Sequence, residues 1–476
     1  MNTQIFYYRE WVINTMLKRA AVLMLSLSIT ACANLSTQSL FSHYSASNAQ
    51  VHEALQQGNY TQAVEALPES PAGDILDGME RGRVNFVAEQ YTDSFAALQR
   101  ADMAVKEQQR QASIQLSEGL NQAGALLTND NMITYQPADY ELGFMHLYLA
   151  LNYIQQKDLE GALVEVRRAN QVQEAARKLR EAELGQAAQE AQRNELSQNL
   201  GAVLARYPDA GEKLANVQNG YLFYLSGILY EADGDLNSAY IDYKRALAVA
   251  PDNMYIANTV LRLATRMQMT EDLKPLQARY GQYAPEKAGA GRVIILDEQG
   301  VVQARDGWRL PLWLPDSRGD GVIYNLALPY YRDMPRQNLG SLVLDDQPVK
   351  ASELANVNNM AKSSLNEELP VIVVRQALRV VAKNEVRKSA AKNGNDIGNV
   401  LANIFNTLTE QPDTRSWQSL PSSISMYHTD LKAGIHELSW NGQSLDVKVA
   451  AGRTTMVWVS RQGNQLSWWS VLLGES

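Results

Sequence analysis

Hydrophobic positions in the first half of the chain recur at helical spacing, in pairs of segments joined by short polar turns. The clearest pair runs from Gly220 to Asn253, with a turn at residues 233–235 and a proline at its end. Small residues allow two antiparallel helices to approach closely, while aromatic rings fill the space between them. The pattern predicts a helical hairpin packed through Phe223, Gly227, Tyr230, Ala239, Tyr243, Ala246 and Pro251.

The offsets in this hairpin match the 34-residue signature of a tetratricopeptide repeat (TPR). A second match covers residues 143–176, where Tyr153, Ala162 and Ala169 take the packing positions, and a third covers 75–108. A fainter candidate lies around Ala54. Because one such hairpin cannot bury its own faces, neighbouring hairpins are required. We therefore predict an irregular TPR-like α-solenoid over residues 51–285.

Two stretches interrupt the expected repeats. Residues 160–215 are rich in Ala, Glu, Gln, Arg and Leu, a composition that favours a long helical arm. We favour a solvated arm over a dimerisation arm, because sustained heptads are lacking. Residues 109–142 do not fit the repeat; they are either a loop-bearing binding segment or a repeat altered by drift, and the sequence favours neither.

Short apolar or alternating runs, separated by Gly, Asp and Pro, replace the long helical pattern from about Gly291. They predict a β-rich, sandwich-like domain over residues 288–476. An amphipathic helical hairpin is expected as an insert at 370–409, beginning after Pro370. The predicted fold class is thus α+β, with a TPR-like solenoid followed by a β-rich domain.

The expected insert carries basic side chains at four-residue steps, namely Arg375, Arg379, Lys383 and Arg387. Such a stripe would contact anionic lipid or an acidic partner. The other interpretation is a solvated face whose apolar side packs on the sheet, and we favour it.

Tryptophans gather on the C-terminal strands, at Trp417, Trp440, Trp458, Trp468 and Trp469. They are compatible with a sugar-stacking platform, but tryptophans on short strands are more often core residues. We favour the core.

The N-terminus has the layout of a signal peptide, predicted for residues 1–31, with Met1 or Met16 as its start. Lys18 and Arg19 precede an apolar run, and the run is too short to span a bilayer. Cys32 follows Ile29-Thr30-Ala31 and is the one cysteine of the chain, so it is the expected site of lipidation. Residues 32–50 are then expected to form a tether, and Ala33 in place of an aspartate points to the outer membrane.

Charge and motifs narrow the functional classes. The net charge of −9 excludes nucleic acid as the expected partner. Ser389-Ala390-Ala391-Lys392 matches an S-x-x-K acylation motif, but the K-T-G companion is missing from the sequence. The five histidines have no metal-ligand spacing. We predict no enzyme, no cofactor and no metal.

Ile29-Thr30-Ala31-Cys32, the helical repeats and the segment from Val374 to Pro421 resemble an uncharacterised family of TPR-containing bacterial outer-membrane lipoproteins. The last stretch combines an Arg-rich helix with Asp413-Thr414-Arg415-Ser416-Trp417. The resemblance implies a lipid-anchored protein at the periplasmic face of the outer membrane, without catalytic residues.

Three functions follow from these observations. The first is a periplasmic TPR scaffold, whose concave side binds another envelope protein during cell-envelope assembly or regulation. The second is a peptidoglycan- or glycan-binding module that acts through the C-terminal β domain. The third is an unrecognised hydrolase, and we rank it last.

Overall fold

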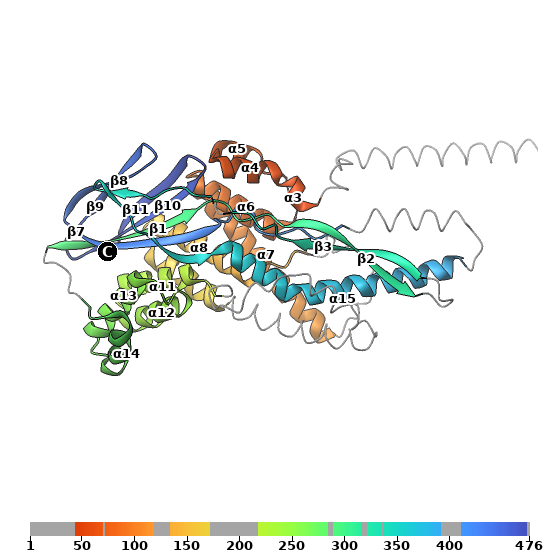
Figure 1. Ribbon diagram of the computed structural model, residues 1–476, viewed down its shortest axis with the longest axis horizontal. Helices are drawn as coiled ribbons and strands as arrows, with labels where there is room; N and C mark the ends of the chain where they lie inside the picture. The colour runs from red at the N-terminus through yellow and green to blue at the C-terminus, as the bar shows by residue number, and fades with distance from the viewer. Residues whose placement is uncertain are drawn as a thin grey trace, which may run out of the picture. The chain divides into compact units, whose positions relative to one another are not determined.

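The computed structural model describes residues 43–69, 72–118, 134–171, 218–283, 289–315, 321–335, 337–391 and 411–473 (Figure 1). Within the chain, Tyr44–Ser476 form one compact unit, distinct from Met1–His43. The expected signal peptide, Cys32, the arm beyond residue 171, the loop at 127–131 and the second helix of the insert lie outside the described residues.

Consecutive helices pair into five hairpins in the described part of the chain. The pairs are α4 (Ala49–Gln57) with α5 (Tyr60–Glu65), α6 (Asp74–Val87) with α7 (Tyr91–Glu118), α8 (Asp139–Gln155) with a helix at 159–171, α11 (Gly220–Asp233) with α12 (Leu236–Val249), and α13 (Met254–Arg266) with α14 (Thr270–Tyr280). The short helix α3 (Tyr44–Ser47) precedes them. Helices α3 and α4 thus occupy the end of the segment expected as a tether.

Close approach of the helices depends on glycine at two of these hairpins. A Cβ atom at Gly227 would lie 2.6 Å from the ring of Tyr243, and one at Gly82 would lie 2.4 Å from Cγ of Leu98. Both distances are far below the 3.5–4.0 Å that carbon atoms prefer. Any larger residue at either position would therefore displace the facing side chain or move the two helices apart.

The hairpin formed by α13 and α14 was not predicted, although Met254 stands 34 residues after Gly220. Leu261 occupies the repeat position of Gly227, and α14 contains Pro275. Leu261 is fully buried all the same. The hairpin has the length of the repeat but lacks the small residue by which a repeat is recognised.

The strands form three sheets. The largest has the order β11-β10-β1-β7-β6. Its strands are β11 (Gln465–Leu473), β10 (Thr454–Gln462), β1 (Ala290–Gln299), β7 (Ser423–Lys432) and β6 (Ser352–Asn356). Strands β1 and β10 run parallel, and the other neighbours run antiparallel.

A four-stranded sheet has the order β5-β4-β8-β9. Its strands are β5 (Gln347–Pro348), β4 (Val343–Leu344), β8 (Gly434–Trp440) and β9 (Gln443–Val449). The third sheet is an antiparallel hairpin of β2 (Asp306–Pro315) and β3 (Gly321–Tyr330).

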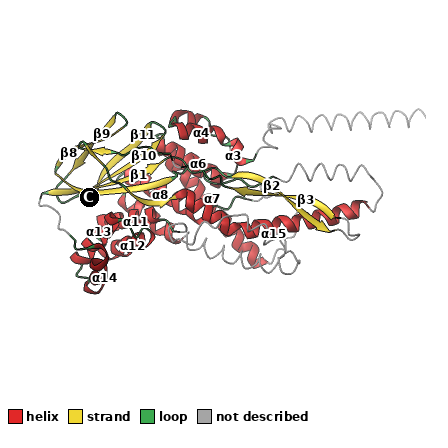
Figure 2. Cartoon of the chain, viewed as in Figure 1, coloured by secondary structure: helices red, strands yellow, loops and turns green. Residues whose placement is uncertain are grey.

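Strand β1 contributes to two hydrophobic cores, one on each face of the five-stranded sheet. Val293 and Ile295 pack with residues of β8 and β9, as expected for a sandwich-like arrangement. Ile294 and Leu296 point the other way and join the core of the helices. Figure 2 shows the strand β1 beside the helices of the array. Because side chains alternate along a strand, one buried strand serves both cores. The helical and β-rich parts therefore share a core, which the sequence analysis did not predict.

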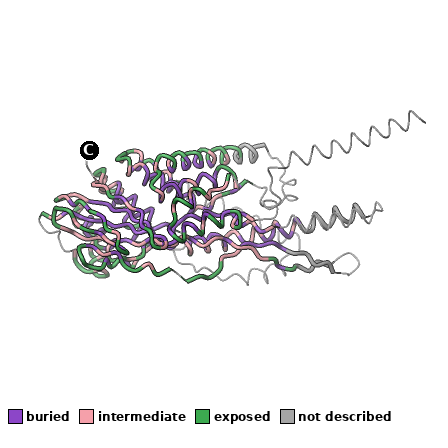
Figure 3. Tube along the Cα trace, turned by 90° about the horizontal axis from the view of Figure 1, so that it is seen from above, coloured by how far each residue is buried: buried purple, intermediate pink, exposed green. Residues whose placement is uncertain are grey.

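Helix α15 (Val357–Ala391) packs on the hairpin of β2 and β3. It begins well before the expected start after Pro370, and that proline lies inside the helix. Val373 and Ala377 pack against Leu310 and Leu326 of the two strands. Figure 3 shows buried positions in the helices and the central strands alike. The apolar side of this helix is thus covered by a sheet, as we favoured, but Arg379 of the expected solvated face is buried.

Candidate functional site

The first helices of the hairpins hold a segment of the same chain. On α6, Glu80 accepts hydrogen bonds from the backbone N–H groups of Gln418 at 2.6 Å and Ser419 at 3.0 Å. On α8, Glu141 accepts one from Trp417 at 2.7 Å. Trp417 is fully buried. The concave side, which we expected to bind a partner, is therefore covered here by the chain's own residues 417–419.

A third buried carboxylate joins the sheet to the same helices. Glu298 of β1 accepts hydrogen bonds from Arg83 of α6 at 2.8 Å and Tyr148 of α8 at 2.9 Å. It also accepts them from Trp458 of β10 at 3.0 Å and Tyr221 of α11 at 3.2 Å. Buried hydrogen bonds of this kind fix the relative position of the elements that carry them.

The pH dependence of stability should reveal the burial of Glu80. Burial raises the pKa of Glu80 from 4.5 to about 7, against the opposing effect of its hydrogen bonds to residues 418 and 419. The folded protein therefore holds the Glu80 proton more tightly than the unfolded chain, and stability is lost as pH rises from about 4.5 to 7. We expect the free energy of unfolding of the wild type, relative to Glu80→Gln, to fall by about 3 kcal/mol between pH 5 and pH 8.

Urea titrations of both proteins across that pH range measure this difference. A difference that stays constant with pH would contradict the prediction.

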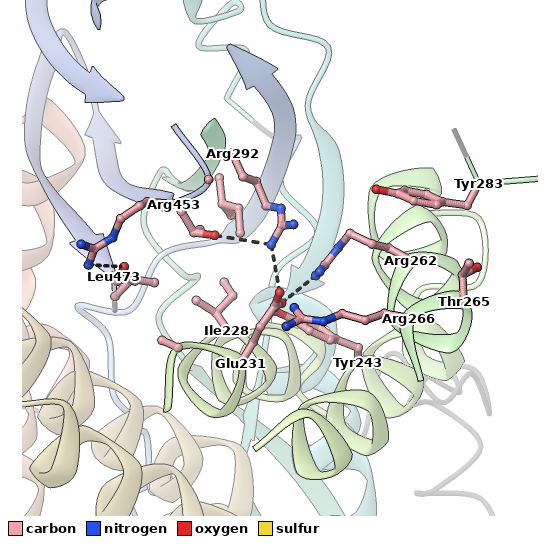
Figure 4. A pocket seen from close by; sticks show the side chains of 14 residues that line it. Ile228, Glu231, Tyr243, Arg262, Thr265, Arg266, Tyr283, Arg292, Arg453 and Leu473 are labelled. Atoms are coloured by element: carbon pink, nitrogen blue, oxygen red, sulfur yellow. Dashed lines mark hydrogen bonds and ion pairs between the residues drawn. The ribbon is translucent and has the colours of Figure 1, made fainter. Parts of the chain in front are cut away.

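A cavity of about 750 Å³ lies where the helices meet one end of strands β1, β10 and β11 (Figure 4). Helices α11, α12 and α13 form one side, and residues of β1, β10 and β11 form the other. The lining residues are Ile228, Glu231, Ala232, Tyr243, Arg262, Thr265, Arg266, Tyr283, Arg292, Ile294, Gly452, Arg453, Thr454 and Leu473. This cavity is the candidate functional site.

Glu231 organises the base of the cavity. Its carboxylate binds Arg262 of α13 at 2.7 Å and Arg292 of β1 at 3.0 Å, and it accepts the Tyr243 hydroxyl at 3.1 Å. Burial by itself would raise the pKa of Glu231, but the two arginines outweigh it and bring that pKa to about 2. Glu231 is therefore ionised at neutral pH and holds both guanidinium groups in place.

Two further arginines face the cavity. Arg266 stands one helical turn after Arg262 and is exposed, and it makes no ion pair or hydrogen bond with the described residues. Arg453 donates to the carbonyl oxygen of Leu473 at 3.2 Å. Four arginines thus oppose one glutamate in the lining, although Asp430 lies beside Arg292 on the neighbouring strand β7.

The positive field also acts on a neighbouring histidine. Burial, and then the charges of Arg292 and Arg262, lower the pKa of His428 to about 3. His428 is therefore neutral at neutral pH.

The sequence analysis missed this site because its arginines are far apart in the chain. Only Arg262 and Arg266 share an element. Arg292 and Arg453 meet through the parallel pairing of β1 with β10, where Arg292 is opposite Thr454. The four-residue spacing of Arg262 and Arg266 on α13 is the one local pattern that could have indicated the site.

The predicted TPR positions pack inside the hairpins. Fully buried are Ala162, Ala169, Ala239 and Ala246, and nearly so are Tyr243 and Phe223. Partly buried are Tyr153, Tyr230 and Pro251.

The expected basic stripe requires a correction. Arg379 is only 1% exposed, and Arg375 is half-buried, so these two do not form an exposed face. Helix α15 packs on β2 and β3 and turns Arg379 inward. The side chains of Lys383 and Arg387 lie outside the described residues.

The tryptophans are mostly core residues, as favoured. Trp417, Trp440, Trp458 and Trp469 are buried, and Trp468 is half-buried. Trp458 and Trp469 stack on each other with ring centroids 5.9 Å apart. A carbohydrate platform on these buried rings would require them to leave the core.

The outer surface of the array carries exposed apolar side chains. They are Met103 on α7, Val164 on the helix at 159–171 and Ile241 on α12, with exposed fractions of 60%, 44% and 52%. Each belongs to the second helix of a hairpin. Val164 and Ile241 occupy the same repeat position, since each stands 21 residues after the first position of its repeat.

The described residues contain neither a membrane-spanning helix nor a cluster of metal-binding side chains. None of the helices there combines the length and the apolar character needed to cross a bilayer. Across the same residues, three or more His, Cys, Asp or Glu side chains nowhere gather in a way that could hold a metal ion.

These hairpins define a TPR-like helical array joined to a β-rich region. The solved structures that resemble the chain include MamA of AMB-1 in two crystal forms, P212121 and C2221, with identities of 13% and 14% and TM-scores of 0.26. Each alignment covers 49% of this chain, and 88% and 95% of the MamA chains.

Another similar structure is the TPR2AB domain of yeast Sti1 in its pHSP90 complex, at 8% identity and a TM-score of 0.18, over 49% of this chain and 88% of that one. At TM-scores this low, the fold is described from the chain's own helices and strands and not from these structures. No protein-family model and no curated protein matches the chain.

Proposed function

We propose that this protein is a lipid-anchored scaffold of the bacterial cell envelope, and that it binds another envelope protein on the outer face of its helical array. The observation that carries the proposal is the division between the two faces of the array. The inner face holds the sheet and residues 417–419. The outer face keeps exposed apolar side chains at recurring positions.

The contacts between neighbouring hairpins support the outer face as one binding surface. Arg168 pairs with Asp102 of α7, and Arg167 donates to the Tyr230 hydroxyl of α11 at 3.1 Å. The helix that carries Val164 is therefore fixed to the hairpins on both sides. A preorganised apolar surface loses little conformational entropy on binding. Its partner is an envelope protein with a complementary apolar surface.

A photo-crosslinking residue in place of Ile241 tests this surface in cells. We expect a discrete protein adduct at position 241 and none at Glu271, an exposed control position on α14. Val164→Glu should abolish the adduct, because it places a charge on the apolar contact surface. Equal adducts at 241 and 271, or an adduct that survives Val164→Glu, would contradict the proposal.

A binding assay with isolated sacculi, combined with the crosslinking result, addresses the glycan-binding alternative. Full-length protein would be incubated with isolated sacculi, with and without the Ile241 substitution. Retention on sacculi without a protein adduct would favour glycan binding over the scaffold.

The proposed anchor rests on the N-terminal sequence. Ile29-Thr30-Ala31-Cys32 resembles a lipoprotein processing site, and Ala33 follows the cysteine. Acyl chains on Cys32 would hold the protein at the periplasmic face of the outer membrane, since each buried methylene contributes roughly 0.8 kcal/mol.

Cys32→Ser is expected to move the protein from the membrane fraction to the soluble fraction, because the thiol is the site of acylation. Cell fractionation and immunoblotting measure the change. Ala33→Asp serves as the matched variant, and it should keep the protein on membranes but shift it to the inner membrane. Unchanged membrane attachment of Cys32→Ser would refute the anchor.

A further inference from the structure

We propose that strand β11 is the interface of a two-fold dimer, in which it pairs antiparallel with β11 of a second copy of this chain. Strand β11 is the last strand of the five-stranded sheet, and β10 is its one neighbour in that sheet (Figure 1). The pairing would join two five-stranded sheets into one. It concerns self-association, so it goes beyond the proposed binding of an envelope protein and does not depend on it.

Other sheet edges of the described structure are protected against strand pairing. Strand β6 has five residues and a register shift, and its Glu353 carbonyl accepts a hydrogen bond from Asn253 at 3.2 Å. On β9, Asp446 and Lys448 are exposed, and the Lys448 carbonyl accepts a hydrogen bond from the Thr455 hydroxyl at 2.8 Å. Short strands, bulges and charged side chains are common means by which proteins block an edge.

The hairpin of β2 and β3 is protected in two other ways. Strand β2 contains Pro311, which lacks the N–H group that a pairing strand would need. On β3, the backbone N–H and carbonyl groups of Ala327 both bond to the side chain of Gln376 on α15. Strand β5 has only two residues and ends in Pro348.

Strand β11 has none of these protections. It is nine residues long, and its pairing with β10 runs without a register shift from Gln465 to Leu473. Between these two residues the sequence contains neither a charged side chain nor a proline. A long, uncharged edge strand of this kind is suited to pairing with another strand.

The backbone groups available for pairing point away from β10. Gln462 and Gln465 flank a two-residue turn, so they form a hydrogen-bonded pair, and such pairs recur at every second residue. The N–H and carbonyl groups of Trp468, Ser470 and Leu472 are therefore directed to the free edge. These groups make no hydrogen bond with the described residues.

The chemistry of β11 favours a second copy as its partner. In a two-fold antiparallel pair, each residue lies opposite a residue of the same strand, so charged residues near the axis would repel each other. Strand β11 carries no such charge. Val471, Leu472 and Leu473 are half-buried, and successive side chains lie on opposite faces of the sheet. The added strand must therefore be apolar on both faces, and β11 itself meets this requirement.

Ser470 is the expected centre of the pair. Gln465 and Ser470 are the exposed residues of β11, and Gln465 adjoins the turn. With Ser470 opposite Ser470 of the second copy, the two residues would exchange both hydrogen bonds, and their Cα atoms would lie about 5.5 Å apart. A disulfide can bridge that separation.

Disulfide formation tests the pairing directly. Cys32 is the one cysteine of the chain, so purified full-length protein with Cys32→Ser contains no other thiol. Adding Ser470→Cys should give a covalent dimer on a non-reducing gel after mild oxidation. Ser444→Cys is the matched control, because Ser444 is also an exposed serine on an edge strand, β9. The control should stay monomeric on the gel.

Sedimentation velocity measures the association without a crosslink. The protein with Cys32→Ser alone should sediment as a dimer. Adding Ser470→Lys should weaken dimerisation at least about tenfold, because it places two like charges opposite each other. Ser470 is exposed, so this variant should fold normally, and circular dichroism checks that it does. Ser444→Lys should leave the dimer unchanged.

Three results would overturn the inference: a monomer at all concentrations tested, equal disulfide yields from Ser470→Cys and Ser444→Cys, or equal effects of the two lysine variants. These experiments use the purified protein without a partner. Their outcome is therefore independent of the crosslinking experiment at Ile241.

Discussion

Arg83→Ala is expected to lower the free energy of unfolding by about 3–5 kcal/mol, the usual cost of removing one partner from a buried ion pair. Arg83 and Glu298 are 1% and 0% exposed, and their Nη2 and Oε2 atoms are 2.8 Å apart. Without the guanidinium group, the Glu298 carboxylate would remain buried with only neutral donors. Urea unfolding followed by circular dichroism measures the loss.

The loss should also depend on pH. Burial raises the pKa of Glu298 above its ordinary value, against the opposing charge of Arg83. Removing Arg83 raises that pKa further. A raised carboxyl pKa in the folded state means that stability is lost as pH rises, so the variant should be penalised more at pH 8 than at pH 5.

Arg110→Ala is the matched control for this prediction. Arg110 and Glu107 form a pair of similar length, 2.7 Å, but their side chains are 63% and 48% exposed. Solvent screens such a pair, so no measurable change is expected. If Arg83→Ala were no more destabilising than Arg110→Ala, the buried pair would have no role in holding the helices to the sheet.

Trp417→Ala is expected to lower the free energy of unfolding by about 3–5 kcal/mol, because it empties a large volume in the core. Trp417 is 0% exposed, and its ring centroid lies 5.9 Å from that of Tyr148 on α8. Its Nε1 donates to the Ser419 hydroxyl at 2.9 Å. The substitution would loosen the segment that Glu80 and Glu141 hold. Thermal and urea unfolding measure this effect.

Trp468→Ala provides a comparison of equal chemistry. Trp468 is half-buried and packs on the core between the two larger sheets. Because Trp468 is half-buried, folding removes less of its apolar surface from water. The loss of unfolding free energy in Trp468→Ala should therefore be clearly smaller than in Trp417→Ala. Similar losses for the two tryptophans would show that residues 417–419 are not a central contact.

Arg83→Ala and Trp417→Ala both test the shared core of the helical and β-rich parts. Arg83 and Glu298 join α6 to β1, and Trp417 joins α8 to the segment before β7. A single cooperative unfolding transition is expected for Tyr44–Ser476, because contacts of both kinds would be lost together. The covered inner face also explains why the proposed partner surface lies on the second helices.

Local patterns allowed several elements to be predicted. The hairpin at Gly220 was found because Gly227 and Tyr243 stand at repeat spacing, and these two residues do meet in the structure. The hairpin of α13 and α14 was missed because Leu261 replaces the small residue and Pro275 interrupts the second helix. The sequence pattern predicts that helix α15 begins after Pro370, because proline often ends or precedes a helix, but the helix begins at Val357 and contains that proline.

The sequence by itself determined most of the helical hairpins and the change to short strands, because both depend on the spacing of neighbouring residues. The burial of the tryptophans followed from their residue type on short strands. Only the tertiary structure decided that the inner face is covered, that Arg379 is buried and that four arginines surround one cavity. Those features depend on pairings between distant segments, such as β1 with β10 and Glu80 with residues 418–419. Such pairings arise when whole faces are buried together, and local periodicity carries no record of which faces meet.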